Sequence, residues 1–268
     1  MTALDPRIDR AARWLHESHL ARRSYTPIPA DDAPRSIAEA DAIQEAFVAL
    51  KAKSSNASVA GYKVAITTQA MRDFTKFQDS IPGVVLDAQV QRSPGVLRLA
   101  EFGKALIECE LAFEIGDDVL AIGKPFDRST IGSYVSAVMP AFEIADDRNA
   151  DYKTIAADIL SLAADNAWNE GAVLGAPVRD WQRIDLALVH GVAKINGTVV
   201  GEGYGRDVLG HPLEALAWLA NRLLASGRVL RRGHIVLTGS LVASKFPRTG
   251  DRVEFAVAGL GSVALQAE

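Results

Sequence analysis

The sequence contains little cysteine and no strong excess of charge. Among its 268 residues Cys109 is the single cysteine, so an internal disulfide framework is excluded. The formal net charge is −4, and lysine and arginine are scattered along the chain rather than clustered. This distribution offers no basic surface for the phosphate backbone of a nucleic acid, and we expect no nucleic-acid partner.

Long apolar runs are also absent. No stretch approaches the roughly 18 apolar residues that indicate a transmembrane helix. Residues 1–15, MTALDPRIDRAARWL, carry acids and arginines where a secretory signal has its apolar region. We therefore expect no membrane association and a cytoplasmic protein. What the chain does have is 49% hydrophobic residues, which is enough to form a substantial core.

Apolar spacing predicts two helices near the N-terminus, over residues 7–22 and from Ser36 to about residue 52. Ser36, with Glu39 three residues later, forms the capping-box signature of a helix start. His16 and His19 fall on the first helix. Because no further histidine or cysteine lies nearby to complete a metal site, we interpret both as surface residues.

From about residue 59 the pattern changes to short apolar runs separated by glycine, which is typical of β-strands. These runs include LIECELAFEI, AVMPAFEIA, LALVHGVAKI and HIVLTGSLV. Asn196-Gly197 predicts a two-residue hairpin turn, because both positions of such a turn need a conformation that these residues adopt readily. The back half of the chain is therefore expected to be mostly strand.

Helices are expected to interrupt this pattern at about residues 129–138, 154–164 and 211–227. The resulting fold class is α+β, with a helical N-terminal segment, residues 1–58, followed by a mixed, β-rich catalytic body, residues 59–268. No low-complexity tract or linker separates the two parts, so we expect them to form one integrated unit.

The run IECELAFEI, residues 107–115, has an apolar face and a face that carries Glu108, Glu110 and Glu114, because side chains alternate along a strand. Two interpretations remain open. The acids lie on a solvated strand face, or Glu108 and Glu110, about 6–7 Å apart along that face, form half of a hard-cation site. Glu114 lies outside the pair, and we interpret it as a solvated acid.

Three further segments place polar groups in apolar strand patterns. Glu143 in AVMPAFEIADDR either completes an all-oxygen site suited to Mg²⁺ or Mn²⁺ or pairs with an arginine. Lys63 in VAGYKVAITT either extends to the surface or faces the acids, where it would stay charged and pass a proton. Thr238, Gly239 and Ser240 end an apolar strand, and they either present hydroxyl and N–H groups to an oxyanion or form an ordinary strand exit.

A series of motifs follows in order from about residue 40 to the end: GYKVAITTQAM, ECELAFEIGDDV, AVMPAFEIADDR, ADNAWNEGAVLG, GHPLEALAWLANRL, RRGHIVLTGSL and AGLGSV. Together they resemble the 2-oxopent-4-enoate hydratase and 4-oxalocrotonate decarboxylase branch of the fumarylacetoacetate hydrolase superfamily. The resemblance implies a β-rich roll with a helical N-terminal part, and assembly as a homo-oligomer. It also implies Mg²⁺ or Mn²⁺ held by Glu108, Glu110 and Glu143, with Lys63 as the active-site lysine and Thr238 to Ser240 in the substrate pocket.

The resemblance further implies small 2-oxo or 2-hydroxydienoic acid substrates from meta-cleavage of aromatic compounds. Our leading hypothesis is a hydro-lyase, a Mg²⁺-dependent hydratase that adds water to a 2-hydroxy-2,4-dienoate and gives a 4-hydroxy-2-oxoacid. A 2-oxo-3-enedioate (4-oxalocrotonate) decarboxylase is the first alternative, because its motifs are shared. An acylpyruvate C–C hydrolase and a noncatalytic subunit that stabilises a partner enzyme are the others.

The chain departs from the family pattern shortly after Lys63. Arg72 stands where glutamine is common, and Ile81 stands where an aspartate is expected two residues before Gly83. These changes leave the metal chemistry intact but leave the substrate open. Arg72 either recognises a second carboxylate of the substrate, as a substrate-binding residue, or is a solvated helix residue.

Overall fold

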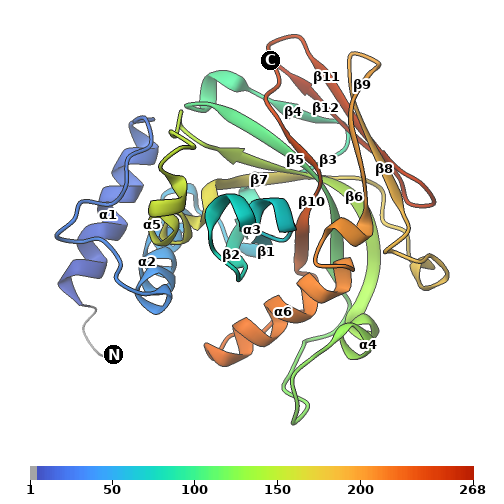
Figure 1. Cartoon of the computed structure of the whole chain (residues 1–268), viewed down its shortest axis with the longest axis horizontal. Coiled ribbons are helices and arrows are strands. Elements are labelled where there is room, and N and C mark those ends of the chain that lie inside the picture. Colours follow the sequence, from blue (N-terminus) through green and yellow to red (C-terminus); the bar gives the residue numbers. More distant parts are fainter. Residues whose placement is uncertain (1–4) are drawn as a thin grey trace.

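The computed structural model describes residues 5–268 as a curved, β-rich roll beside a layer of N-terminal helices, as Figure 1 shows. A seven-stranded sheet has the order β2-β1-β10-β5-β6-β7-β3, and a five-stranded sheet has the order β4-β12-β11-β8-β9. The expected α+β class is confirmed. The strands are β1 Val59–Ala65, β2 Ile81–Leu86, β3 Val90–Arg92, β4 Gly95–Leu97, β5 Ala105–Ile115, β6 Val135–Asp146, β7 Asn169–Leu174, β8 His190–Ile195, β9 Thr198–Tyr204, β10 Ile235–Lys245, β11 Arg252–Val257 and β12 Gly261–Ala267. The helices are α1 Pro6–Leu20, α2 Ile37–Ser55, α3 Gln69–Thr75, α4 Arg128–Ile131, α5 Ile159–Ala164 and α6 Pro212–Ala225.

The two N-terminal helices form where the sequence predicts them. The side chain of Asp5 accepts a hydrogen bond from the Arg7 amide at the start of α1, and that of Ser36 accepts one from the Glu39 amide at the start of α2. These bonds satisfy amide groups that have no partner within the helix. The carboxylate of Glu39 accepts from the Arg35 amide instead of the Ser36 amide, so the predicted capping box is half formed.

The strands β5 and β6 form a long antiparallel pair in the seven-stranded sheet, and both faces of this pair are buried. On one face Ile107, Cys109 and Phe142 join the main hydrophobic core, which also contains residues of the helices and of the five-stranded sheet. On the other face Ala112 and Met139 belong to a second apolar cluster. The interpretation of a solvated strand face is therefore wrong for most of β5.

Three elements differ from their predicted extent. The helix expected at about 154–164 begins only at Ile159. The helix expected at about 129–138 is one turn that ends at Ile131, and β6 begins at Val135. The ladder with β5 extends to Val135, and these tertiary hydrogen bonds outweigh the local helix preference. The run LALVHGVAKI forms a strand only from His190 onward. None of the helices in the described part of the chain, 5–268, is both long and apolar enough to cross a membrane.

Two backbone features depend on a glycine with a positive φ angle. The hairpin at Asn196-Gly197 is confirmed, with φ values of 52° and 82° at the two residues. The Thr238–Ser240 segment lies inside β10 rather than at its end, which corrects the predicted strand exit. From Leu237 to Ser240 the strand advances three residues while its partner β5 advances two, so β10 bulges, with Gly239 at a φ of 113°.

Candidate metal centre

The register of the central strands brings three glutamates together. Glu108 on β5 lies directly opposite Glu143 on β6, and Glu110 lies on the same face of β5, two residues further along. Carboxylate oxygens of these residues, one from each, lie within 4.8 Å of one another. Glu110 and Glu143 are fully buried, and Glu108 is partly exposed. We refer to Glu108, Glu110 and Glu143 as the carboxylate cluster.

Lys63 reaches this cluster from β1. Its side chain is buried, and its Nζ lies 2.9 Å from Oε1 of Glu143. Gly83, opposite Lys63 on β2, makes room for it, because a Cβ at position 83 would lie 2.8 Å from Lys63 Cγ. Lys63 therefore faces the acids instead of extending to the surface, and the cationic partner of Glu143 is this lysine rather than the arginine of the alternative interpretation.

Three more groups orient the acids. The Gly239 amide donates to Oε2 of Glu110 at 2.7 Å. Asn169 Nδ2 on β7 donates to Oε1 of Glu143 at 3.0 Å, and Ser244 Oγ on β10 donates to Oε1 of Glu108 at 2.8 Å. The sequence does not predict Asn169 and Ser244 as site residues, because neutral polar residues at strand ends give no signal of burial. For Asn169 the one available signal is its place in the ADNAWNEGAVLG motif.

Several oxygens of this site lack a partner. Glu110 Oε1, Glu143 Oε2 and Asn169 Oδ1 are buried and accept no hydrogen bond from the described residues. A buried polar atom without a partner costs about 1–3 kcal/mol, and more when it is charged. These atoms are all oxygens, which are the ligands that Mg²⁺ and Mn²⁺ prefer. The residues present therefore fit a hard divalent cation.

The electrostatics of the cluster point the same way. Burial, with Glu143 and Glu108 close by, raises the pKa of Glu110 well above its ordinary value. Burial also raises the pKa of Glu143, although the Lys63 ammonium opposes it. Burial alone would lower the pKa of Lys63, but the attraction of Glu143 and Glu108 outweighs it and the pKa is raised. The site thus combines a stable ammonium with an excess of carboxylates, an excess that a bound cation would neutralise.

The remaining predicted residues lie around the cluster but outside it. Thr238 Oγ1 donates to the Leu111 carbonyl at 3.2 Å, and Ser240 Oγ accepts from the Cys109 amide at 3.0 Å, so both hydroxyls are bonded to β5. Of that segment only the Gly239 amide reaches an acid of the cluster. Arg72 lies on α3, and its Nε donates to the Ile66 carbonyl at 3.5 Å.

Glu114 is separate from the cluster, as expected, but it is paired rather than simply solvated. Its Oε1 accepts from Ser136 Oγ at 2.7 Å and lies 3.2 Å from Nη1 of Arg179. Its carboxylate therefore has its own partners, and it points to no cation. All three acids lie on the same face of β5, so their spacing alone does not separate the cluster residues Glu108 and Glu110 from Glu114. The neighbouring strands, which supply the partners of each acid, do separate them.

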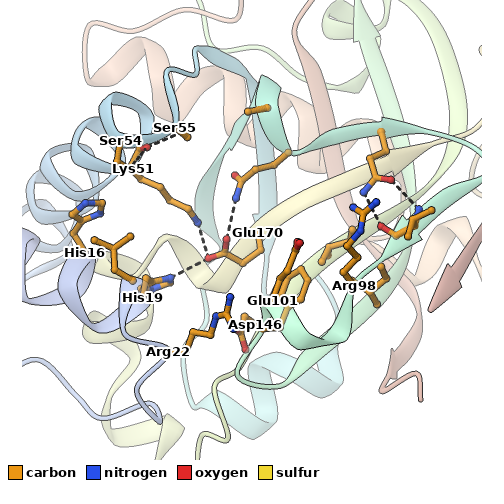
Figure 2. A pocket seen from close by; sticks show the side chains of 18 residues that line it. His16, His19, Arg22, Lys51, Ser54, Ser55, Arg98, Glu101, Asp146 and Glu170 are labelled. Atoms are coloured by element: carbon orange, nitrogen blue, oxygen red, sulfur yellow. Dashed lines mark hydrogen bonds and ion pairs between the residues drawn. The ribbon is translucent and has the colours of Figure 1, made fainter. Parts of the chain in front are cut away.

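A second buried charge cluster joins α1 and α2 to β7. His19 Nε2 lies 2.6 Å from Oδ1 of Asp165, and its Nδ1 lies 3.0 Å from Oε1 of Glu170. Lys51 Nζ lies 2.6 Å from the same Glu170 oxygen, and Arg148 binds the other oxygen of Asp165. Figure 2 shows His19 and Lys51 converging on Glu170 beside a cavity of about 530 Å³. We call these five residues the His19 network.

The His19 network corrects the interpretation of His19 as a surface residue. Its side chain is only 12% exposed, because Asp165 and Glu170 hold it inside. Burial alone would lower the pKa of His19, but these two carboxylates outweigh burial and raise it. Burial likewise opposes the ionised form of Glu170, but Lys51 and His19 lower its pKa to about 2. No local pattern indicates this pairing, since His19 and its acid partners are about 150 residues apart.

The chain is similar to known proteins over nearly its whole length. Residues 49–267, which include the carboxylate cluster and Lys63, match the fumarylacetoacetate hydrolase C-terminal family. The chain is 29% identical over 261 residues to a 2-hydroxyhexa-2,4-dienoate hydratase of Comamonas testosteroni, with 97% of each chain covered. It is 28% identical over 265 residues to a 4-oxalocrotonate decarboxylase of Pseudomonas putida, covering 98% of this chain and 94% of that one.

The fold has a close counterpart among solved structures. The 4-oxalocrotonate decarboxylase from Pseudomonas putida G7, solved in complex with magnesium and adipate, superposes with a TM-score of 0.89. The match covers 100% of this chain and 99% of that chain at 24% sequence identity. A fumarylpyruvate hydrolase from Pseudomonas aeruginosa superposes less closely, with a TM-score of 0.60 over 77% of this chain and 88% of that chain at 16% identity. Only the first of these two similarities includes the whole chain, N-terminal helices and both sheets.

Proposed function

The chain belongs to the fumarylacetoacetate hydrolase C-terminal family, as its motifs indicated, and from this premise we propose that it is a hydro-lyase that hydrates a small 2-hydroxy-2,4-dienoate. The product is a 4-hydroxy-2-oxoacid, in the meta-cleavage degradation of aromatic compounds. One observation carries the proposal: buried carboxylates with unsatisfied oxygens surround a buried, charged lysine. The hydratase of Comamonas testosteroni, related over 97% of its length, supports the reaction class.

In this proposal Glu108, Glu110 and Glu143 hold Mg²⁺ or Mn²⁺, and the Gly239 amide and Asn169 keep two of these carboxylates in place. When bound, the cation supplies Lewis-acid polarisation of the substrate's 2-oxygen. The protein contributes the orientation of the acids, because each has at least one oxygen fixed by a hydrogen-bond donor. Orientation of this kind typically changes metal affinity or activity by about 10- to 100-fold.

Lys63 is the proposed catalytic residue. In the metal-free protein Glu143 and Glu108 raise the pKa of Lys63 against the effect of burial, so Nζ carries a proton that it can donate. Within residues 5–268 only Glu143 lies within ion-pair distance of Nζ, which leaves N–H groups for a substrate oxygen. Tautomerisation of the dienol to the conjugated 2-oxo-enoate makes C4 electrophilic, and water then adds there. Thr238, Gly239, Ser240 and Arg72 line the proposed substrate side.

A 2-oxo-3-enedioate decarboxylase is the second candidate. The Pseudomonas putida decarboxylase is 28% identical to this chain, against 29% for the hydratase, and the same electron sink serves both reactions. An acylpyruvate C–C hydrolase has less support, because the fumarylpyruvate hydrolase structure matches a smaller part of this chain. A homo-oligomer is proposed as well, and Leu120 and Ile122, which are 56% and 41% exposed, offer an apolar contact for it. A pathway partner enzyme is a further candidate for this assembly.

One assay separates the two reactions. Metal-stripped protein is incubated with a 2-hydroxydienoate and with a 2-oxo-3-enedioate, with and without Mg²⁺, while dienol absorbance and released CO₂ are followed. We expect loss of dienol that depends on Mg²⁺ and releases no CO₂. CO₂ release would assign the decarboxylase instead, and no reaction with either substrate would contradict both. Light scattering of the same sample measures the assembly.

A further inference from the structure

A cavity lies just after the end of β1. It has a volume of about 630 Å³ and is formed by the turn after β1, by the first residues of α3 and by residues 206–210. Its charged lining residues are Arg72, Arg206 and Asp207. We call it the arginine cavity.

A contact between Thr67 and Gly239 links the arginine cavity to the carboxylate cluster. Thr67, in the cavity wall, packs directly on Gly239, because a Cβ built on Gly239 would lie 1.9 Å from Thr67 Oγ1. The amide of the same glycine donates to Glu110. Thr67 is four positions after Lys63 in the chain, so the two Cα atoms lie at most about 14 Å apart. This separation is within the reach of a small, extended substrate whose reactive end lies at Lys63.

The charges of the arginine cavity favour an anion. Neither Arg72 nor Arg206 forms an ion pair with a residue in the part of the chain that the structure describes, 5–268. Arg206 lies over the Tyr204 ring, with its guanidinium carbon 4.1 Å from the ring centre, which leaves the edge of the guanidinium free. The one acid, Asp207, already accepts a hydrogen bond from the Tyr204 amide at 2.7 Å. Two arginines thus line the cavity, and neither has a carboxylate partner among residues 5–268.

We infer that the arginine cavity binds the remote carboxylate of a dicarboxylic substrate. The natural substrate is then a 2-hydroxy-dienedioate or the 2-oxo-enedioate derived from it, rather than a dienoate with an apolar tail. Guanidinium groups suit this role because they bind a carboxylate with two parallel hydrogen bonds. The inference rests on the proposed function, since it takes the carboxylate cluster and Lys63 as the site of the reactive end.

The test compares two substrates across matched arginine variants. The ratio of kcat/KM for a 2-hydroxy-dienedioate to that for 2-hydroxypenta-2,4-dienoate is measured for the wild type, Arg72→Gln, Arg206→Gln and Arg35→Gln. Arg35 is exposed and far from the cavity in the sequence, so Arg35→Gln serves as the control. We expect the ratio to fall about 10- to 100-fold in the two cavity variants, as for loss of a charged hydrogen bond. An unchanged ratio in both cavity variants overturns the inference.

A binding measurement keeps this inference separate from the proposed function. Calorimetry measures the affinities for hexanedioate and hexanoate in the presence of Mg²⁺. The difference between the two affinities measures binding of the second carboxylate without any turnover. If neither dienol reacts but the wild type prefers hexanedioate and Arg72→Gln does not, the cavity assignment stands and the proposed reaction fails. If both dienols react but hexanedioate binds no better than hexanoate, the reaction stands and the cavity assignment fails. If the protein shows neither turnover nor preference, both are wrong.

Discussion

The carboxylate cluster and the His19 network both contain buried charges, the first on neighbouring strands and the second where α1 and α2 meet β7, yet they satisfy those charges in opposite ways. In the His19 network each carboxylate oxygen of Asp165 and Glu170 has a protein donor. In the carboxylate cluster three acids share a single ammonium, and oxygens of Glu110 and Glu143 have no donor. Correspondingly, the pKa of Glu170 is lowered to about 2 while the pKa of Glu110 is raised.

The difference teaches how a structural ion network is told apart from a cation site. Burial opposes the ionised form in both places, so burial alone does not decide the role. What decides it is the balance of charge and of donors within reach. The His19 network has more cationic groups than acids and holds the helices to the sheet. The carboxylate cluster has too few hydrogen-bond donors and too little positive charge for its three acids. A divalent cation would supply the missing positive charge and bind the unsatisfied oxygens.

The largest expected effect comes from breaking the satisfied network with Glu170→Gln. Lys51 would then lose its carboxylate partner, and His19 would keep only Asp165, which together cost about 3–5 kcal/mol in the free energy of unfolding. Urea unfolding measures this loss. Glu202→Gln, which breaks an exposed pair with His190, is the control and should cost no more than about 1 kcal/mol. Equal effects of the two variants would contradict the contrast between buried and exposed pairs.

Breaking the deficient cluster with Glu110→Gln should have the opposite effect on the metal-free protein. The amide oxygen still accepts from the Gly239 amide, while repulsion from Glu143 and Glu108 disappears, so stability without metal should not fall. Mg²⁺ affinity and turnover should each drop at least about 100-fold, because losing a ligand exceeds the loss of an outer-shell contact. Calorimetry with Mg²⁺ measures the first quantity. Glu114→Gln, on the same strand face, is the matched control; wild-type Mg²⁺ affinity in Glu110→Gln would show that the site is misassigned.

A smaller effect is expected when a donor to the cluster is removed. Asn169→Ala deletes the amide that fixes Glu143 Oε1, and we expect Mg²⁺ affinity to fall about 10-fold with the fold retained. Asn221→Ala is the control, because Asn221 bonds the backbone of Phe126, away from the cluster. It should lower stability without changing Mg²⁺ affinity. Identical Mg²⁺ affinities of the wild type and Asn169→Ala would remove Asn169 from the site.

The smallest expected effect is the pH dependence of the stability that the His19 network contributes. Because the folded pKa of His19 is raised above its unfolded value of about 6.5, its contribution to stability is full below that value and is lost as pH rises through the folded pKa. Stability of the metal-free wild type and His19→Gln is measured by urea unfolding from about pH 5 to 9, the range that brackets this titration. The difference between them should shrink toward high pH. His16→Gln, on the same helix, is the control: burial lowers the pKa of His16, so this variant removes no such contribution.

Much of the fold could be predicted because its signals are local. The cap at Ser36, the turn at Asn196-Gly197 and the helix that begins at Pro212 each depend on a few neighbouring residues, and all three are confirmed. The helix expected at 129–138 is wrong over its second half because β5 captures Val135 and the residues after it. The sequence pattern predicts a strand end at Thr238 to Ser240, because a bulge depends on the partner strand, which local sequence does not reveal.

The sequence by itself determined the α+β class, the family and the identity of the acids and the lysine, because ordered motifs and alternating apolar patterns are written along one chain. Which acids lie together follows only from the tertiary structure. Glu108 lies opposite Glu143 on the neighbouring strand, and Glu114 pairs with Arg179. His19, predicted to lie on the surface, is part of a buried ion network. The physical reason is that burial and charge pairing depend on distances between strands and helices that are remote in sequence. The same pattern of acids on a strand is a solvated face or a cation site according to what packs against it.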